Sequence, residues 1–153
     1  MYKRQQLVLL ALLAGENILL VGAPGTAKSV LGRRLAKLLL TEDSPFFQRL
    51  LTRFTTLEEV FGPLSLKGLE QDQYYRQTQG YLPNASVAFL DELFKANSAI
   101  LNSLLGILNE RQYPNGNSSD DCALQCVIGA SNELPQSSSS ELEALYDLSL
   151  IHI

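Results

Sequence analysis

The sequence predicts an α/β fold with a mainly parallel β-sheet. Short apolar runs that are typical of buried strands recur along the 153 residues, at 17–21, 46–52, 86–90 and 124–130. Segments with a helical spacing of apolar residues lie between them, at 30–40 and 98–110. Three of the four runs are followed within two residues by a glycine, a carboxylate or a carboxamide, which suits the ligand-binding edge of such a sheet. Strands that alternate with helices are typical of βαβ units and a parallel sheet.

The first half of the chain supplies two of these strands. A helix is predicted over residues 6–14 and ends at Gly15, ahead of the first strand. The helix after that strand extends to about Leu40, and a polar connection leads to the second strand. A short helical turn is predicted at 56–61, with Thr55 or Thr56 as its cap and a Gly-Pro pair as its stop.

The second half begins with a less regular stretch. Residues 64–82 are rich in glutamine, tyrosine and glycine, and we expect a small hairpin or an inserted loop there. The third strand, at 86–90, is followed by the amphipathic helix at 98–110. Residues 114–117 predict the turn of a short hairpin before the fourth strand. A polar loop at 137–140 precedes a last helix that begins at Glu141.

The strongest chemical signal is a glycine-containing loop between the first strand and the next helix. It fits the pattern G-x-x-x-x-G-K-[ST] and consists of Gly22, Ala23, Pro24, Gly25, Thr26, Ala27, Lys28 and Ser29. In a strand–turn–helix context this pattern predicts a cradle of backbone N–H groups for phosphate. Lys28 is then expected to contact the β- and γ-phosphates, and the Ser29 hydroxyl to hold Mg²⁺.

A pair of carboxylates follows the third strand. Asp91 and Glu92 end the apolar run that begins near Val87. Beside a phosphate cradle, Asp91 is expected to bind Mg²⁺ directly or through its waters, and Glu92 to orient and deprotonate an attacking water. Adjacent strand residues point to opposite faces, so the strand must end here for Glu92 to turn toward the phosphate. The alternative is a plain solvated strand end.

The fourth strand leads into another polar residue, Asn132. A neutral carboxamide at the carboxyl edge of the sheet could hold the attacking water or contact the γ-phosphate. The competing interpretation is a turn-forming asparagine before the segment that contains Pro135.

These signals, in this order, resemble those of the AAA+ ATPases. The resemblance is closer to the MoxR group and within it to the RavA-like branch, and it covers most of residues 6–147. It rests on GAPGTAKS at 22–29, TRFTTLEEVFGPLS at 52–65, GYLPNASVAFLDELFKA at 80–96, AILNSLLGILNERQYPNG at 99–116, ASNELP at 130–135 and LEALYD at 142–147.

The resemblance implies a P-loop NTPase (AAA+) core that binds and hydrolyses ATP with Mg²⁺. It makes Lys28 the Walker A lysine, Asp91 and Glu92 the Walker B pair, and Asn132 the sensor 1 residue. It also implies a homo-hexamer that acts with a von Willebrand factor A-domain partner and remodels or matures other proteins. Residues 62–82 match the family's inserted segment after its second helix.

The sequence departs from the family at both ends. The hexapeptide at 148–153 matches the translation of a transposon mosaic end used in sequencing libraries, and residues 1–5 match its reverse complement. We therefore expect adapter-derived tails around a partial AAA+ core at 6–147, truncated before the fifth strand and the helical lid. The family's arginine finger would follow Asp147, where Leu148 stands. The chain alone is thus expected to be nearly inactive, with residues 18–21 as an unpaired, aggregation-prone edge.

Three other functions compete with this interpretation. A chelatase-type AAA+ motor subunit would share the same motifs, and a non-catalytic, nucleotide-dependent interaction module would need only the phosphate loop. A GTPase switch is disfavoured because the residues after the fourth strand do not supply the guanine-specific Asn-Lys-x-Asp.

Composition narrows the setting of the protein. The chain is 46% apolar and has a net charge of −4, which argues against nucleic acid or an anionic membrane as its main partner. It has no apolar run near the roughly 20 residues of a membrane span and no signal-peptide layout at its start, so a cytoplasmic location is expected. Its two cysteines, Cys122 and Cys126, have poor metal-binding spacing.

Overall fold

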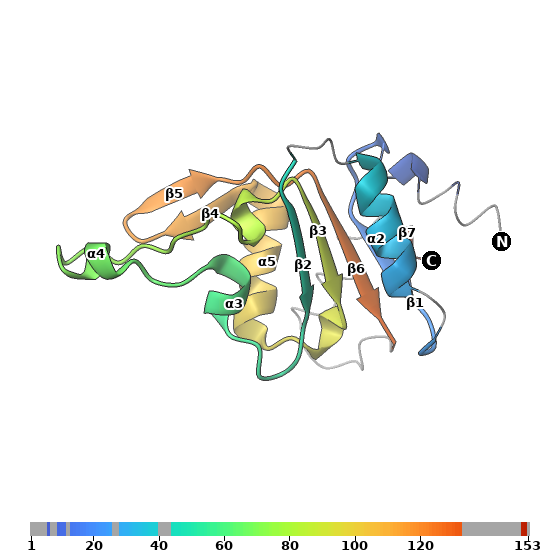
Figure 1. Cartoon of the computed structure of the whole chain (residues 1–153), viewed down its shortest axis with the longest axis horizontal. Helices are drawn as coiled ribbons and strands as arrows, with labels where there is room; N and C mark the ends of the chain where they lie inside the picture. The colour runs from blue at the N-terminus through green and yellow to red at the C-terminus, as the bar shows by residue number, and fades with distance from the viewer. Residues whose placement is uncertain are drawn as a thin grey trace.

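The protein folds around a five-stranded parallel sheet, seen in a computed structural model (Figure 1). The structure describes residues 6, 9–11, 13–25, 28–39, 44–132 and 151–152. The strand order is β2-β3-β6-β1-β7, and a separate antiparallel hairpin is formed by β4 and β5. The strands are β1 (Ile18–Val21), β2 (Phe46–Leu50), β3 (Val87–Asp91), β4 (Gln112–Asn115), β5 (Ser118–Asp121), β6 (Cys126–Ser131) and β7 (Ile151–His152).

Helices cover both faces of this sheet. The helix α2 (Lys28–Leu39) lies on one side, and α3 (Leu57–Phe61) and α5 (Ser98–Glu110) lie on the other (Figure 1). Short helices also form at α4 (Leu66–Leu69), η1 (Leu82–Asn84) and η2 (Leu93–Lys95). The predicted α/β class with a parallel sheet is thereby confirmed.

The alternation of side chains along each strand produces two hydrophobic cores. In β3, Val87 and Phe89 pack with α2, whereas Ala88 and Leu90 pack on the side of α5. β1 and β6 divide their side chains between the same two cores. Because both faces of the sheet are covered here, β1, β3 and β6 are apolar at successive positions, as expected for parallel strands.

The bounds of α5 agree with the sequence prediction of 98–110. The helix begins after Asn97, whose side chain accepts a hydrogen bond from the backbone N–H of Ile100 at 3.1 Å. It ends at Arg111, which adopts a left-handed conformation with φ of 56°. The buried face of α5 consists of Ile100, Leu101, Leu104 and Ile107.

The segment predicted as a hairpin or inserted loop contains α4 and an antiparallel bridge between Leu64 and Arg76. It contacts the β4–β5 hairpin through Asn115, a buried residue that is 7% exposed. The Asn115 carboxamide accepts from the Arg76 N–H at 2.6 Å and donates to the Arg76 carbonyl at 3.1 Å. The Asn115 carboxamide therefore joins two segments that are remote in sequence, because it pairs with the backbone of Arg76 as a neighbouring strand would.

One expectation about the sheet is wrong. The outer edge of β1 is not unpaired, because β7 joins it in parallel with Ile18 opposite Ile151 and Leu19 opposite His152. Backbone N–H and C=O groups at a sheet edge can pair with any extended segment, whatever its side chains. The two residues that form this strand belong to the segment expected to be a foreign tail. The expected last helix from Glu141 lies outside the described residues.

In the described part of the chain, no helix is long and apolar enough to cross a bilayer.

Close packing between α2 and β3 depends on a glycine. A Cβ added at Gly32 would lie 2.2 Å from Cε2 of Phe89, whose side chain is fully buried. Gly32→Ala is therefore expected to lower the free energy of unfolding by about 1–3 kcal/mol, the usual range for an overpacked core.

Urea denaturation can test this expectation against a matched variant. Gly106 lies in α5, and a Cβ added there meets no atom within 4 Å. Gly106→Ala should raise the urea midpoint, because alanine is about 0.5–1 kcal/mol better than glycine inside a helix. Equal midpoints for the two alanine variants would contradict the close-packing argument.

Both cysteine thiols are poor nucleophiles in this fold. Burial raises the pKa of Cys126 to about 12, and its thiol donates to the Glu16 carbonyl at 3.1 Å. Burial, followed by the nearby carboxylates of Asp120 and Asp121, raises the pKa of Cys122 to about 11. Cys126 is only 1% exposed and packs as a small apolar side chain.

Candidate functional site

The glycine-containing loop connects β1 to α2 at the carboxyl edge of the sheet. Gly22 continues the strand pairing by donating its N–H to the Ser131 carbonyl at 3.2 Å. Gly25 has φ of 80°, a conformation that favours glycine, and it lets the chain turn back toward α2. Thr26 and Ala27, two of the predicted cradle residues, lie outside the described residues.

Lys28 is the first residue of α2, and its ammonium group turns back over the loop. Nζ donates to the carbonyls of Gly22 at 2.6 Å and Ala23 at 2.9 Å. It also donates to Oδ1 of Asn132 at 2.7 Å. The charge is thus held between the loop and the end of β6 rather than extended into solvent.

The next residue, Ser29, reaches the end of β3. Its hydroxyl donates to Oδ2 of Asp91 at 2.6 Å, across 62 positions of sequence. The other carboxylate oxygen of Asp91 accepts from the backbone N–H of Glu92 at 3.1 Å. A hydroxyl and a carboxylate therefore meet beside the phosphate loop.

Glu92 leaves the strand at once. Its φ of 54° and ψ of 43° are left-handed, which is uncommon for a residue other than glycine. The turn brings its Oε1 to the side-chain amide of Asn132, which donates a hydrogen bond to it. The expectation that the strand must end for Glu92 to turn thus agrees with the backbone.

These side chains line one cavity of about 310 Å³, whose walls are formed by Pro24, Gly25, Lys28, Ser29, Val30, Asp91, Glu92 and Asn132. The sheet register explains why they meet. Val21 lies opposite Ser131 in β1 and β6, and Leu90 lies opposite Gly129 in β3 and β6. The residues that follow these three parallel strands consequently converge at one edge.

The donors at this edge fit a magnesium nucleotide. Mg²⁺ prefers oxygen ligands and is usually held by one or two protein oxygens together with phosphates and waters. Ser29 and Asp91 supply such oxygens, and Lys28 supplies a cation for phosphate. No cluster of three histidine, cysteine or carboxylate side chains that could hold a metal by itself occurs among the described residues.

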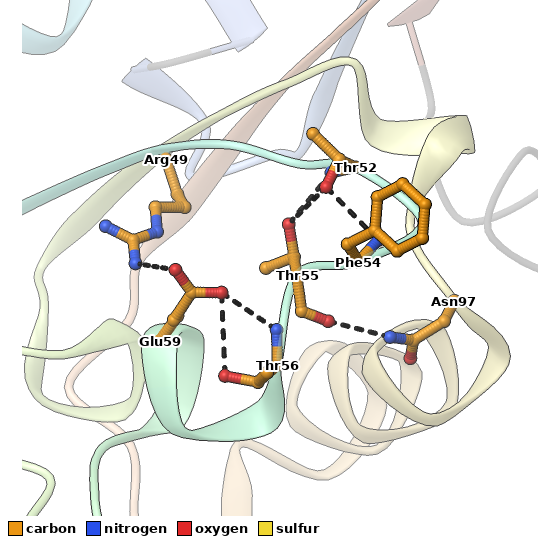
Figure 2. Close-up of polar contacts among 7 residues, drawn as sticks. All are labelled: Arg49, Thr52, Phe54, Thr55, Thr56, Glu59 and Asn97. Atoms are coloured by element: carbon orange, nitrogen blue, oxygen red, sulfur yellow. Dashed lines mark hydrogen bonds and ion pairs between the residues drawn. The ribbon is translucent and has the colours of Figure 1, made fainter.

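A polar network stabilises the loop between β2 and α3, next to the cavity. Leu51, at its start, donates its N–H to the Asp91 carbonyl at 2.8 Å. Within the loop, Thr55 accepts through its hydroxyl from the Thr52 N–H at 2.9 Å, and Asn97 donates to the Thr55 carbonyl at 2.8 Å (Figure 2). Phe54 is left 84% exposed at the tip.

A second contact in Figure 2 anchors the start of α3. The Glu59 carboxylate accepts from the Thr56 N–H at 2.9 Å and pairs with Arg49 at 2.7 Å. The Thr56 hydrogen bond, and then Arg49, hold the pKa of Glu59 below its usual value. Of the two threonines predicted as possible caps of this helical turn, Thr56 occupies the cap position in the structure.

Sequence reasoning missed two residues around the cavity. Val30 contributes an apolar wall, and Lys95 pairs with Glu92 from outside the cavity lining. Lys95 lies three positions after Glu92, and that spacing is a usable signal once a tight turn after the strand is expected.

Comparison with known proteins identifies relatives of this arrangement. The chain is 50% identical over 142 residues to each of two uncharacterized proteins of Methanocaldococcus jannaschii, covering 92% of this chain. It spans 36% and 37% of their lengths, about a third. It is also 34% identical over 113 residues to a structural protein of Acidianus two-tailed virus, covering 72% of this chain and 18% of the viral protein.

Solved structures share the fold at low sequence identity. A candidate ATPase of Cytophaga hutchinsonii superposes with a TM-score of 0.69 at 21% identity, over 99% of this chain and 44% of that one. NtrX of Brucella abortus in complex with ATP gives 0.70 at 16% identity, over 100% and 36%. RuvB of Thermotoga maritima gives 0.62 at 20% identity, over 98% and 42%.

The family assignment comes from the match of residues 3–153 to the model of the MoxR domain in the MoxR-vWA-beta-propeller ternary systems. With that match and the shared fold of the neighbours, the chain belongs to the MoxR family and has the α/β fold of the P-loop AAA+ ATPases.

Proposed function

We propose that the protein binds ATP with Mg²⁺ at the edge formed by β1, β3 and β6 and hydrolyses its γ-phosphate. The observation that carries this proposal is the convergence of five side chains on one cavity of about 310 Å³: Lys28, Ser29, Asp91, Glu92 and Asn132. Family membership and the fold support the same activity. Phosphoryl transfer needs positioning and charge stabilisation more than covalent chemistry from the protein.

Lys28 is the phosphate-binding cation in this proposal. In the structure its ammonium group is held by two loop carbonyls and by Asn132. Carbonyls and a carboxamide are neutral acceptors, whereas a phosphate oxygen offers the stronger charge-assisted bond. We expect the lysine to exchange at least one of these partners for phosphate when nucleotide binds.

Ser29 and Asp91 are the residues that would hold Mg²⁺. Their oxygens are already 2.6 Å apart through a hydrogen bond. The ion would neutralise charge on the β- and γ-phosphates when bound. Asp91 is additionally fixed by the Glu92 N–H, so its carboxylate is oriented before any ligand arrives.

Glu92 and Asn132 are assigned to the attacking water. Glu92 would accept its proton, and Asn132, which contacts both Lys28 and Glu92, would align it. The carboxamide bridges the phosphate-binding cation and the base, so a change at one is transmitted to the other through a single side chain.

Family membership supports a proposal for the wider assembly. The matching domain is described in MoxR-vWA-beta-propeller systems. This supports a von Willebrand factor A-domain partner. We propose that the ATPase acts with it to remodel or mature other proteins. A homo-hexamer, a place in the RavA-like branch and a cytoplasmic location remain our predictions. A neighbouring subunit would then supply the arginine that is expected to complete the site, an effect of about 10³–10⁵ in related systems.

The experiment that tests the proposed function uses the purified protein at the full length of its natural gene, because the present chain spans about a third of its curated relatives. The fluorescence anisotropy of an ATP analogue should rise to a plateau as protein is added in the presence of Mg²⁺. EDTA should weaken this binding. Phosphate release from ATP should accompany it at protein concentrations that support assembly. Saturable binding without any phosphate release would favour the non-catalytic module, and no binding at all would overturn the proposal.

A further inference from the structure

A turn of 3₁₀ helix places Lys95 beside Glu92. The helix η2 follows directly after Glu92, and the Lys95 N–H donates to the Glu92 carbonyl at 2.9 Å. Glu92 itself precedes this helix with a left-handed backbone. The two side chains lie on the same side of the turn, because Nζ of Lys95 is 3.3 Å from Oε2 of Glu92.

The two oxygens of the Glu92 carboxylate have different surroundings. Oε1 accepts a hydrogen bond from the side-chain amide of Asn132, which also lines the cavity. Oε2 is buried and has no hydrogen-bond partner, but the ammonium group of Lys95 lies 3.3 Å away. A buried charged oxygen without compensation is strongly disfavoured. The lysine thus supplies the opposite charge on the side of the carboxylate that is turned from Asn132.

We infer that Lys95 is a positioning residue, which anchors Oε2 so that Oε1 faces the reacting water. This inference rests on the proposed function of Glu92 as the base. One oxygen fixed by charge and the other by Asn132 leave the carboxylate little rotational freedom. Bases that are held close to the productive geometry transfer protons faster, and misplacement by about 1 Å can reduce a rate 100-fold.

Exposure distinguishes this role from that of a stability-giving ion pair. The side chain of Lys95 is 54% exposed and that of Glu92 is 15% exposed. Ion pairs with an exposed partner contribute little to folding. Without Lys95 the buried oxygen of the Glu92 carboxylate loses the cation that lies beside it, so we expect the carboxylate to turn toward water. The thermal midpoint should then fall only modestly, while the catalytic rate falls clearly.

Steady-state ATP hydrolysis by the full-length protein tests the inference. Lys95→Met should lower kcat about tenfold with KM within twofold, since the lysine lies outside the phosphate-binding residues. Lys95→Arg, which keeps the charge, should recover most of the rate. Lys67→Met, at an exposed lysine of α4, is the matched control and should behave as wild type.

A crystal structure of the nucleotide-free Lys95→Met variant gives a readout independent of turnover. Glu92 should leave its contact with Asn132 there, and retention of that contact would overturn the inference. Wild-type kcat in Lys95→Met, beside a large loss in Glu92→Gln, would overturn the role of Lys95 alone. Full activity of Glu92→Gln would overturn the proposed base and the role of Lys95 together.

Discussion

Replacing Glu92 with glutamine is expected to lower kcat for ATP hydrolysis by about 10²–10⁴-fold, the usual contribution of a positioned general base. Glutamine has nearly the same shape but cannot accept the proton of the attacking water. ATP binding should persist, because the residues assigned to phosphate and Mg²⁺ are unchanged. The variant should therefore accumulate bound ATP rather than release phosphate.

Parallel measurements of phosphate release and ATP-analogue binding can check this result. Glu70→Gln is the matched control, since Glu70 is exposed at the end of α4. It should hydrolyse ATP at the wild-type rate. Equal rates for Glu92→Gln and wild type would reject Glu92 as the base. Loss of binding in that variant would instead mean that Glu92 organises the cradle.

Replacing Lys28 with alanine is expected to weaken ATP binding by roughly 10- to 150-fold. That range corresponds to about 1.5–3 kcal/mol for one hydrogen bond to a charged group. The lysine is the only basic side chain that lines the described cavity. Its removal leaves the backbone N–H groups of the loop, together with the proposed Mg²⁺, as the sources of positive potential for phosphate.

Equilibrium titration with a fluorescent ATP analogue measures this effect directly. Lys37→Ala provides the control, because Lys37 is an exposed residue in the last turn of the same helix. Both variants remove one positive charge from α2, so a general electrostatic effect would weaken both alike. Binding that is weakened equally by the two substitutions would contradict a local contact between Lys28 and phosphate.

The central part of the fold could be predicted because its signals are local. The helix at 98–110 has a strong apolar stripe and an asparagine cap, and its predicted bounds agree with α5. The central strands β3 and β6 are apolar up to their last residues, Asp91 and Ser131, because both of their faces are covered. In contrast, β7 forms by backbone pairing with the edge strand β1, and no side-chain pattern in the sequence predicts such pairing.

The candidate site shows the same division. Lys28, Ser29, Asp91, Glu92 and Asn132 could be named because each follows a strand or loop with a recognisable pattern, and parallel strands bring their carboxyl ends together. The contact of Lys95 with Glu92 has only a weak sequence signal, a spacing of three positions that is informative once a tight turn after the strand is expected. It depends on the left-handed φ of a glutamate, a conformation that its side chain does not favour.

The raised pKa values of the two thiols have a practical consequence for labelling with fluorescent dyes. With pKa values of about 11 for Cys122 and 12 for Cys126, neither forms appreciable thiolate at neutral pH. Because folding raises the thiol pKa values above 9.0, both thiols are protonated in the folded and unfolded protein below that pH. As the pH rises above 9.0, the thiols ionise first in the unfolded protein, so the free energy of unfolding falls. A cysteine introduced at the exposed tip of Phe54 would consequently accept a maleimide dye selectively, with both native sulfurs left in place.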